Sequence, residues 1–546
     1  MTLVTAELAL LLDIGSAWTK ATLIGLLRGR WRIVGHAAQP TAWGVETLCM
    51  AIAERLAASA DRRIGDSLVA LITAAPRIEC HTARRPGRLA LAAVSREISG
   101  AAARRAAESA GWLVVEEATT DDGRPIAERL AGLQSAEVDA WLLAGGFDGG
   151  RNEQALEIAA LVAAARPARG GTVIWAGSAH LADAVTSLFE QGAVTSVPNA
   201  RPGPQDEEIA PLRDHLERLL RETVEPESAI HLATISFRRA IGELSRSSGL
   251  RVMGVDVGAR YATLAVGDGQ GGGKSRVFAS GGLGASSLTG PGGPGRVARH
   301  MPQTIDELAV ADVLQNVQAR PATLPQTEDE LAVVQAAARQ QLSLLAAEEG
   351  GVHDIDLLVG AGRVIAGAPH PAQAVQALLD GVRPLGVTQL AIDAAGVLGP
   401  LGSLDDDEIA EGMSALRGEI LVPLGTAVVC RGARPGQVAM RISVERAGWP
   451  TIGPIELRTG QIQVVPLPRG QSAELEITLE EGVSIGGPRR ARRVRARVSG
   501  GLIGLVLDAR GVPIALPRRI DDRRAVLSSW RDALVREPPA AAAGSR

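Results

Sequence analysis

The residues with the clearest chemical potential lie near the start of the chain, in LLLDIGSAWTKATLIG at 10–25. An apolar run ends at Asp13, a turn with glycine and hydroxyl residues follows, and a second apolar run begins after Lys20. Such a turn aims backbone N–H groups and a hydroxyl oxygen at one point, which suits a phosphate, and a lysine adds positive charge. Asp13 would then hold Mg²⁺, which prefers a few carboxylates together with phosphate oxygens. The alternative is that Asp13 and Gly15 only shape a hairpin turn.

A second stretch of the chain repeats this pattern, in LRVMGVDVGARYATLAVGDG at 250–269. An apolar strand ends at Asp256, Gly258 follows two residues later, and a short turn leads into another apolar strand. A repeat over such a long period indicates duplication of a whole domain rather than a solenoid. We therefore predict two related lobes whose hairpins clamp the phosphates of one nucleotide, with an aspartate on either side of the metal.

The remaining elements indicate an α/β protein with a β-rich end. Helical segments such as EQALEIAALVAAA alternate with short apolar runs that read as strands: SLVALIT, GWLVVEE, AWLLAGG and GTVIWAG. Short strands with Gly/Pro turns dominate after Pro435. The predicted parts are a first lobe at 1–245, a second lobe at 246–435, a β-rich domain at 436–520, and a terminal helix with a disordered tail at 521–546.

Composition excludes several classes of protein. A formal net charge of −4 and a pI near 6.1 argue against a nucleic-acid-binding protein. The three cysteines, Cys49, Cys80 and Cys430, lie far apart, which fits neither a disulfide framework nor a zinc site. The first residues lack a basic segment and a cleavage site, and no run approaches the ~20 apolar residues of a membrane span. We expect a cytoplasmic protein that binds neither nucleic acid nor membrane.

Four motifs resemble those of the actin and sugar-kinase superfamily. DIGSAWTK is similar to its first phosphate motif and DVGARYAT to its second, LLVGAGRVIAG at 357–367 to its adenosine motif, and WLLAGGFDGG at 141–150 to its connecting motif. More specifically, the chain resembles the MutL family associated with adenosylcobalamin-dependent glutamate mutase, which is unrelated to the mismatch-repair protein of the same name. RPATLPQTEDELAVVQAAARQ and GGLIGLVLDARGVPIALP extend this similarity over nearly the full length.

The resemblance implies a two-lobed, actin-like ATPase fold with duplicated ribonuclease H-like lobes and a C-terminal β-rich domain. It implies ATP and Mg²⁺ as cofactors, with the phosphates and the metal meeting Asp13, Gly15, Ser16, Thr19 and Lys20. Asp256 and Gly258 would face them, with Asp13 and Asp256 as metal ligands. Gly360 and Gly362 would lie under the adenine, and Asp148 would position a hydrolytic water.

Two departures from the superfamily pattern bear on activity. Ala259, Arg260, Tyr261 and Ala262 stand where glycine and hydroxyl residues are expected, and Arg363 replaces a small residue in the adenosine motif. Nucleotide binding is compatible with these changes, because backbone groups, which the side-chain changes leave in place, make much of the contact with the nucleotide. Hydrolysis of ATP is left open.

The function implied by the resemblance is that of an ATP-switched accessory protein. Its partner would be the subunits of a cobalamin-dependent carbon-skeleton mutase, which it would help to assemble or reactivate. The chain lacks the Asp-x-His-x-x-Gly motif that ligates cobalt, so it is not the mutase itself. One alternative is a small-molecule kinase, for which Asp148 is the candidate base. Another is a nucleotide-binding scaffold or filament protein without turnover.

Three other features have simpler explanations. DGQGGGKS at 268–275 misses the first glycine of a P-loop and precedes a predicted strand rather than a helix, so we expect a hairpin tip. The arginine-rich run at 489–498 alternates with apolar residues, which predicts a solvated sheet face. The terminal helix, with Trp530 on its apolar side, is expected to dock on its own protein rather than on a membrane. His370 is interpreted as a turn residue.

Overall fold

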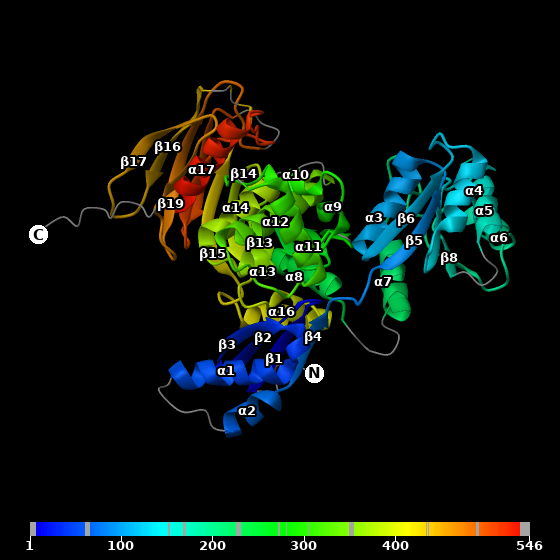
Figure 1. Ribbon diagram of the computed structural model, residues 1–546, viewed down its shortest axis with the longest axis horizontal. Helices are drawn as coiled ribbons and strands as arrows, with labels where there is room; N and C mark the ends of the chain where they lie inside the picture. The colour runs from blue at the N-terminus through cyan, green and yellow to red at the C-terminus, as the bar shows by residue number, and fades with distance from the viewer. Residues whose placement is uncertain are drawn as a thin grey trace, which may run out of the picture. The chain divides into compact units, whose positions relative to one another are not determined.

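The computed structural model describes most of the chain (Figure 1). The described residues are 7–59, 66–150, 153–166, 171–224, 231–270, 273–279, 281–303, 305–348, 354–432, 434, 436–486 and 491–535. They form two compact units. Unit 1 combines Met1–Thr82, Ala233–Lys274 and Gly281–Arg546, and unit 2 combines Ala83–Leu232 with Ser275–Ser280. The predicted tail at 538–546 lies outside the described residues.

The first lobe of unit 1 is a four-stranded sheet in the order β3-β2-β1-β4. Its elements are β1 (Leu8–Ile14), β2 (Trp18–Leu27), β3 (Arg30–Pro40), η2 (Thr41–Trp43), α1 (Val45–Ser59), α2 (Asp66–Thr73) and β4 (Arg77–His81). β1 pairs antiparallel with β2 and parallel with β4.

Both faces of β1 are covered, which explains its uninterrupted apolar sequence. Leu10 and Leu12 pack in a cluster with Ile52 of α1. Leu11 faces the other way and packs in a cluster with Phe237 of α8 (Ala233–Ser248). A strand buried on both faces holds Asp13, the residue before its last, in a fixed position.

The prediction of a strand at SLVALIT is wrong, because residues 66–73 form α2. A short apolar run does not distinguish a strand from a helix by periodicity alone. Here Ile72 is fully buried while Leu71 next to it is 58% exposed, and the partly buried Leu68 lies one helical turn before Ile72. That spacing places Leu68 and Ile72 on the same side of a helix, towards the sheet.

The second lobe of unit 1 repeats the central strand order of the first. β10 (Val252–Val257) pairs antiparallel with β11 (Ala262–Gly267) and parallel with β13 (Leu357–Ala361), as β1 does with β2 and β4. The sheet continues through β14 (Gly386–Ile392), β15 (Val422–Val429), β21 (Gly504–Asp508) and β18 (Ile462–Val465). β12 (Gly273–Phe278) spans the division between the units. The duplicated strand order confirms the predicted two-lobed α/β fold.

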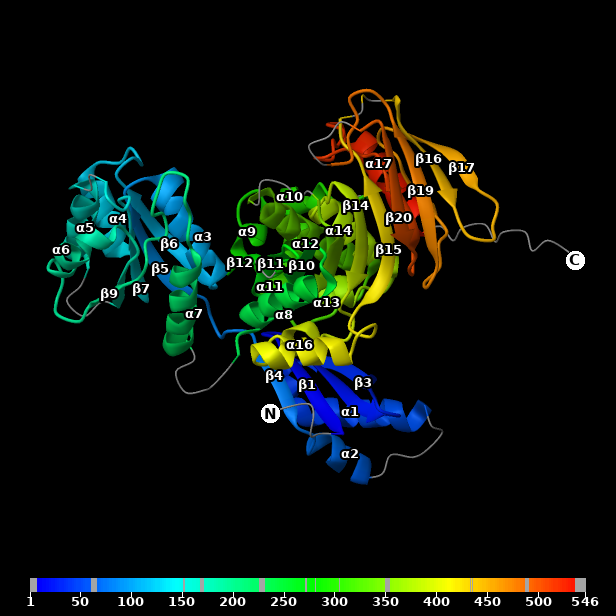
Figure 2. The same cartoon turned by 180° about the vertical axis from the view of Figure 1, so that it is seen from behind.

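Helices surround the second lobe, as both Figure 1 and Figure 2 show. Besides α8, they are α9 (Ser286–Thr289), α10 (Gly293–Ala298), α11 (Glu307–Ala319), α12 (Glu328–Glu348), α13 (Arg363–Ala366), α14 (Pro371–Gly381), α15 (Leu398–Leu401) and α16 (Asp406–Ala415). His370 caps α14, because its Nδ1 accepts the Ala372 N–H at 3.1 Å. It is therefore the turn residue that the sequence indicated.

The last part of unit 1 is an antiparallel sheet in the order β17-β16-β19-β20. Its strands are β16 (Val438–Glu445), β17 (Ile452–Arg458), β19 (Ser472–Leu479) and β20 (Arg493–Ser499). Arg493, Arg495 and Arg497 of β20 are exposed in alternation, which confirms a solvated sheet face for this part of the arginine-rich run. Helix α17 (Ile520–Val535) docks through Trp530, whose Nε1–H donates to the Gly460 oxygen at 2.7 Å.

Unit 2 is a separate α/β domain with a five-stranded parallel sheet in the order β6-β5-β7-β8-β9. Its elements are β5 (Gly87–Ala93), η3 (Arg96–Gly100), α3 (Ala101–Ser109), β6 (Trp112–Thr119), α4 (Ile126–Ser135), β7 (Ala140–Ala144), α5 (Glu153–Ala165), β8 (Thr172–Trp175), η4 (Ala179–Leu181), α6 (Ala182–Thr186), β9 (Val194–Ser196) and α7 (Ala210–Val224). This is a doubly wound order, in which the direction of winding reverses between β5 and β7.

Two further expectations from the sequence concern disulfide bonds and membrane-spanning helices. All three cysteines are buried and free, so they form no disulfide. No helix within the described ranges is both long and apolar enough to cross a bilayer.

Candidate functional site

The two predicted hairpins have the same backbone arrangement. In the first, Asp13 lies opposite Lys20 across β1 and β2, and the Gly15 N–H donates to the Trp18 oxygen at 3.0 Å. In the second, Asp256 lies opposite Thr263 across β10 and β11. There the Gly258 N–H donates to the Tyr261 oxygen at 2.9 Å. Each turn therefore carries its aspartate at the end of the central strand of its lobe.

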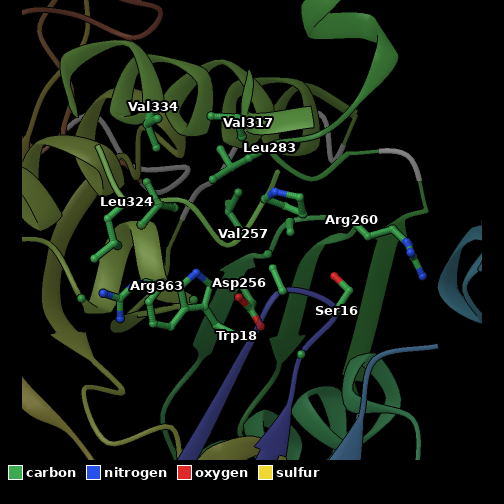
Figure 3. Close-up of a pocket in the computed structure, with 18 of the residues that line it drawn as sticks. Ser16, Trp18, Asp256, Val257, Arg260, Leu283, Val317, Leu324, Val334 and Arg363 are labelled. Atoms are coloured by element: carbon green, nitrogen blue, oxygen red, sulfur yellow. The ribbon is translucent and has the colours of Figure 1, made fainter. Parts of the chain in front are cut away.

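Both hairpins open into one cavity of about 540 Å³ in unit 1 (Figure 3). This volume lies within the range of small-molecule sites. Of the residues predicted from the sequence, those that line the cavity are Asp13, Gly15, Ser16, Lys20, Asp256, Gly258 and Gly362. Figure 3 shows Trp18, Asp256 and Arg363 close together, with Leu283 and Val317 farther off on the opposite wall. The cavity thus combines a charged wall with an apolar one.

Lys20 is one of the cations that line the cavity. Its Nζ donates to Asp13 Oδ2 at 2.9 Å. Burial lowers the pKa of the Lys20 ammonium, but the carboxylates of Asp13, Asp256 and Asp393 outweigh this and raise that pKa above its ordinary value. Lys20 therefore stays protonated and can meet an anionic ligand.

Asp256 is the least satisfied acid in the cavity. Its Oδ1 is buried and has no hydrogen-bond partner among the described residues. Burial is the main cause that raises the pKa of the Asp256 carboxyl to about 6; Asp13 and Asp393 act in the same direction, and Lys20 opposes them. A buried carboxylate oxygen without a donor, near a second carboxylate, fits a site for a hard divalent cation. Within the described residues no three His, Cys, Asp or Glu side chains are arranged to hold a metal ion by themselves, so a cation here would take two carboxylates from the protein and further oxygens from a ligand.

Gly362 brings the end of β13 against Asp256. Its φ is +79°, and a Cβ there would lie 2.4 Å from Asp256 Oδ1 and 2.5 Å from the Val257 oxygen. Only glycine fits such a position without displacing the carboxylate.

Two predicted residues of unit 1, Gly360 and Thr19, lie outside the cavity lining. A Cβ at Gly360 would come within 2.6 Å of Ile365, so this glycine lets α13 pack closely on β13. Thr19 is buried, and its Oγ1 donates to Thr41 Oγ1 at 3.0 Å. Thr41 in turn donates to the Gly15 oxygen at 2.8 Å, so Thr19 contacts the first turn through Thr41.

Asp148, predicted to position a water, belongs to unit 2. It follows β7, and its Oδ1 accepts hydrogen bonds from the Ala179 N–H at 3.2 Å and from Asn199 Nδ2 at 3.1 Å. These bonds tie together loops that follow three neighbouring strands of unit 2. Its catalytic role stays a prediction.

Three residues in or beside the cavity were not among the site residues predicted from the sequence. Asp393 follows β14 and is 3% exposed, and its carboxylate accepts the N–H groups of Val397 at 2.9 Å and Leu398 at 3.0 Å. The apolar run LAID ending in an acid was an available signal for it. Trp18 and Arg363 line the cavity and contact each other, a pairing that no local pattern predicts.

Comparison with known protein families gives a match to the first part of the chain. The family described as MutL protein matches residues 9–234. The predicted resemblance to the MutL family is confirmed over this range. The MutL match contains the first hairpin and all of unit 2 except Ser275–Ser280, and it ends before the second hairpin. No curated protein matches the chain in sequence.

Solved structures with a similar chain path have low identity. One is the activator of the 2-hydroxyisocaproyl-CoA dehydratase from Clostridium difficile with bound ADPNP, at 11% identity and a TM-score of 0.27, covering 75% of this chain and 98% of that one. Another is (R)-2-hydroxyglutaryl-CoA dehydratase component A from Acidaminococcus fermentans, at 10% identity and a TM-score of 0.24. The match covers 74% of this chain and 100% of that one. A third is xylulose kinase from Bifidobacterium adolescentis, at 12% identity and a TM-score of 0.26. The match covers 77% of this chain and 96% of that one. The fold assignment rests on the duplicated strand order.

Proposed function

We propose that the cavity of unit 1 binds ATP with Mg²⁺ and that the protein is an ATP-dependent accessory factor for another enzyme. The observation that carries this proposal is the meeting of Asp13, Lys20 and Asp256, from two separate sheets, at one cavity. Two acids and a lysine at the tips of twin hairpins are the groups that a metal-bound polyphosphate requires.

Each residue has a defined part in this binding. Lys20 would contact phosphate oxygens, together with the Ser16 hydroxyl and backbone N–H groups of the two turns. Asp13 and Asp256 would hold Mg²⁺, which would neutralise phosphate charge. The buried Oδ1 of Asp256 would then gain the partner that it lacks in the protein alone.

Nucleotide binding would also bias how the two lobes meet. Direct contacts between them include the Thr22 hydroxyl donating to the Ala395 oxygen at 2.6 Å and the Ile33 N–H donating to Glu419 Oε2 at 2.7 Å. A ligand that touches both hairpins stabilises the arrangement in which the lobes are together, by its difference in affinity between the two states. This gives the protein a means of signalling its nucleotide state to a partner.

For the partner we propose a cobalamin-dependent carbon-skeleton mutase of the glutamate mutase type. The support is the MutL family match over residues 9–234. The accessory role would be to assemble the mutase or to restore it after inactivation.

Calorimetry with ATP and Mg²⁺ tests the nucleotide site. Wild-type protein should bind, and Asp13→Ala should weaken binding at least about 10-fold, the size expected for a lost charged contact. Asp407→Ala, in an exposed turn of α16, is the matched control and should bind as wild type does. No binding by the wild-type protein would refute the site. Recovery of an inactivated mutase with and without ATP tests the partner separately.

A further inference from the structure

Arg363 and Trp18 form a stacked pair across the cavity. The guanidinium carbon of Arg363 lies 3.7 Å from the centroid of the Trp18 ring (Figure 3). Trp18 begins β2 of the first lobe, and Arg363 begins α13 of the second. Both side chains line the cavity that contains Asp13 and Asp256.

Arg363 differs from Lys20 in its ion pairing. In the described part of the chain no carboxylate forms an ion pair with Arg363, and its Nε is buried without a hydrogen-bond acceptor. Burial also lowers the pKa of this guanidinium. An arginine nevertheless remains charged in proteins. The cavity therefore holds a cation whose charge and donors are not satisfied by the protein.

The stacking geometry leaves the donors of Arg363 available. A guanidinium stacks through its flat face, whereas its five N–H groups point outward in its plane. The Trp18 ring covers one face and limits the rotation of the group, so the in-plane donors are held in position. Such a fork matches the paired oxygens of a phosphate.

We propose that Arg363 binds a phosphate group of the nucleotide and that Trp18 positions its guanidinium for this contact. The inference rests on the proposed nucleotide site and adds a second cation to it. Its ligand chemistry is the phosphoryl oxygens of a nucleoside di- or triphosphate. Because the pair joins the two lobes, phosphate binding by Arg363 also fastens the first lobe to the second.

The test compares ligands with and without phosphates on matched variants. Calorimetry is carried out with ATP, ADP and adenosine on wild type, Arg363→Met, Arg363→Lys and Trp18→Leu. The control is Arg30→Met, an exposed arginine at the start of β3. Arg363→Met should weaken ATP and ADP binding roughly 10- to 100-fold and change adenosine binding less than about 2-fold.

The other variants separate charge from position. Arg363→Lys should lose less ATP affinity than Arg363→Met, because it keeps the charge and loses the fork. Trp18→Leu should weaken ATP by a smaller factor, roughly 3-fold, since it removes only the stacking. The ratio of ATP affinity to adenosine affinity is the decisive quantity, because a general loss of stability does not change it.

Three results would overturn the inference. Equal weakening of ATP and adenosine by Arg363→Met would mean that Arg363 contacts the base rather than a phosphate. Unchanged ATP binding by Arg363→Met, with wild type binding normally, would refute the role of Arg363 and leave the proposed function standing. Absence of ATP binding by wild type would refute both.

Discussion

The hairpins β1–β2 and β10–β11 share a backbone and differ in charge. Both place an aspartate near the end of a buried central strand, and in both the glycine N–H of the turn donates to the backbone oxygen three residues later. Opposite Asp13 stands Lys20, and opposite Asp256 stands Thr263. One acid is therefore neutralised within its own hairpin, while the other keeps an unpaired buried oxygen. The two hairpins together contain two aspartates and one lysine, so Asp256 is the aspartate left to bind a cation of the ligand.

The turns differ in how tightly they are closed. A Cβ at Gly15 would lie 2.4 Å from the Trp18 oxygen, whereas a Cβ at Gly258 would lie 3.4 Å from the Tyr261 oxygen. The first turn thus tolerates only glycine, and the second has room for a methyl group. The first hairpin is constrained around its lysine, and the second is the more permissive copy.

The largest expected difference between the hairpins is in nucleotide affinity. Lys20→Met should weaken ATP·Mg²⁺ binding roughly 100-fold, because it removes a charged contact to phosphate and leaves Asp13 without its partner. Thr263→Val, at the matching position of the other hairpin, should change affinity less than about 3-fold. Calorimetry on the two variants measures both values. Equal losses would mean that the lysine has no special part in binding.

A smaller difference is expected in stability when the turn glycines are replaced. Gly15→Ala should lower the free energy of unfolding by about 2 kcal/mol, because the new methyl group overlaps a backbone oxygen. Gly258→Ala should stay within about 0.5 kcal/mol of wild type. Urea unfolding followed by circular dichroism compares them. A Gly258→Ala protein as unstable as Gly15→Ala would show that the two turns are equally tight.

The smallest effect concerns the two acids and pH. Burial holds the pKa of Asp256 at about 6 in the folded protein, against 3.8 in an ordinary environment. The folded state therefore binds the proton more tightly than the unfolded state, and stability falls as pH rises from about 4 to 6. Asp256→Asn removes this loss, so it should be about 1 kcal/mol more stable than wild type at pH 7 and lose that advantage near pH 4.

Asp13→Asn is the contrasting variant for this pH experiment. It deprives Lys20 of its 2.9 Å ion pair, so it should be less stable than wild type at pH 7 by about 1 kcal/mol. Thermal unfolding of the nucleotide-free proteins between pH 4 and pH 8 measures both. If the two substitutions shift stability in the same direction at pH 7, the claim that Asp13 is paired and Asp256 is unpaired in the folded protein is wrong.

The sequence predicted the hairpins and the duplicated fold because their signals are local. An apolar run ending in Asp-x-Gly is visible in a few residues, and two copies indicate two lobes. Asp393 also ends an apolar run, LAID at 390–393, but it lacks the Asp-x-Gly turn that marks the two hairpins. The alanine-rich β5 gave no strand signal of its own, because β-branched residues are absent from it.

Other features depend on distant parts of the chain and were not predictable. The stacking of Arg363 on Trp18 joins two lobes, and no spacing in the sequence indicates it. Residues 275–280 belong to unit 2 although they follow the second hairpin in sequence. Tertiary packing decides both, and a single sequence records it only indirectly. The helix at 66–73 was misread for the related reason that a short apolar run suits either kind of element.

Iron-directed cleavage tests most directly whether both hairpins hold one metal-bound nucleotide. Fe²⁺ replaces Mg²⁺ in the ATP complex, peroxide and ascorbate generate radicals at the metal, and mass spectrometry locates the cuts in the chain. If Asp13 and Asp256 hold one metal ion in the ATP complex, ATP-dependent cuts should occur near both aspartates, and excess Mg²⁺ should suppress both together. Cuts near only one of these aspartates, with ATP still bound, would contradict this prediction.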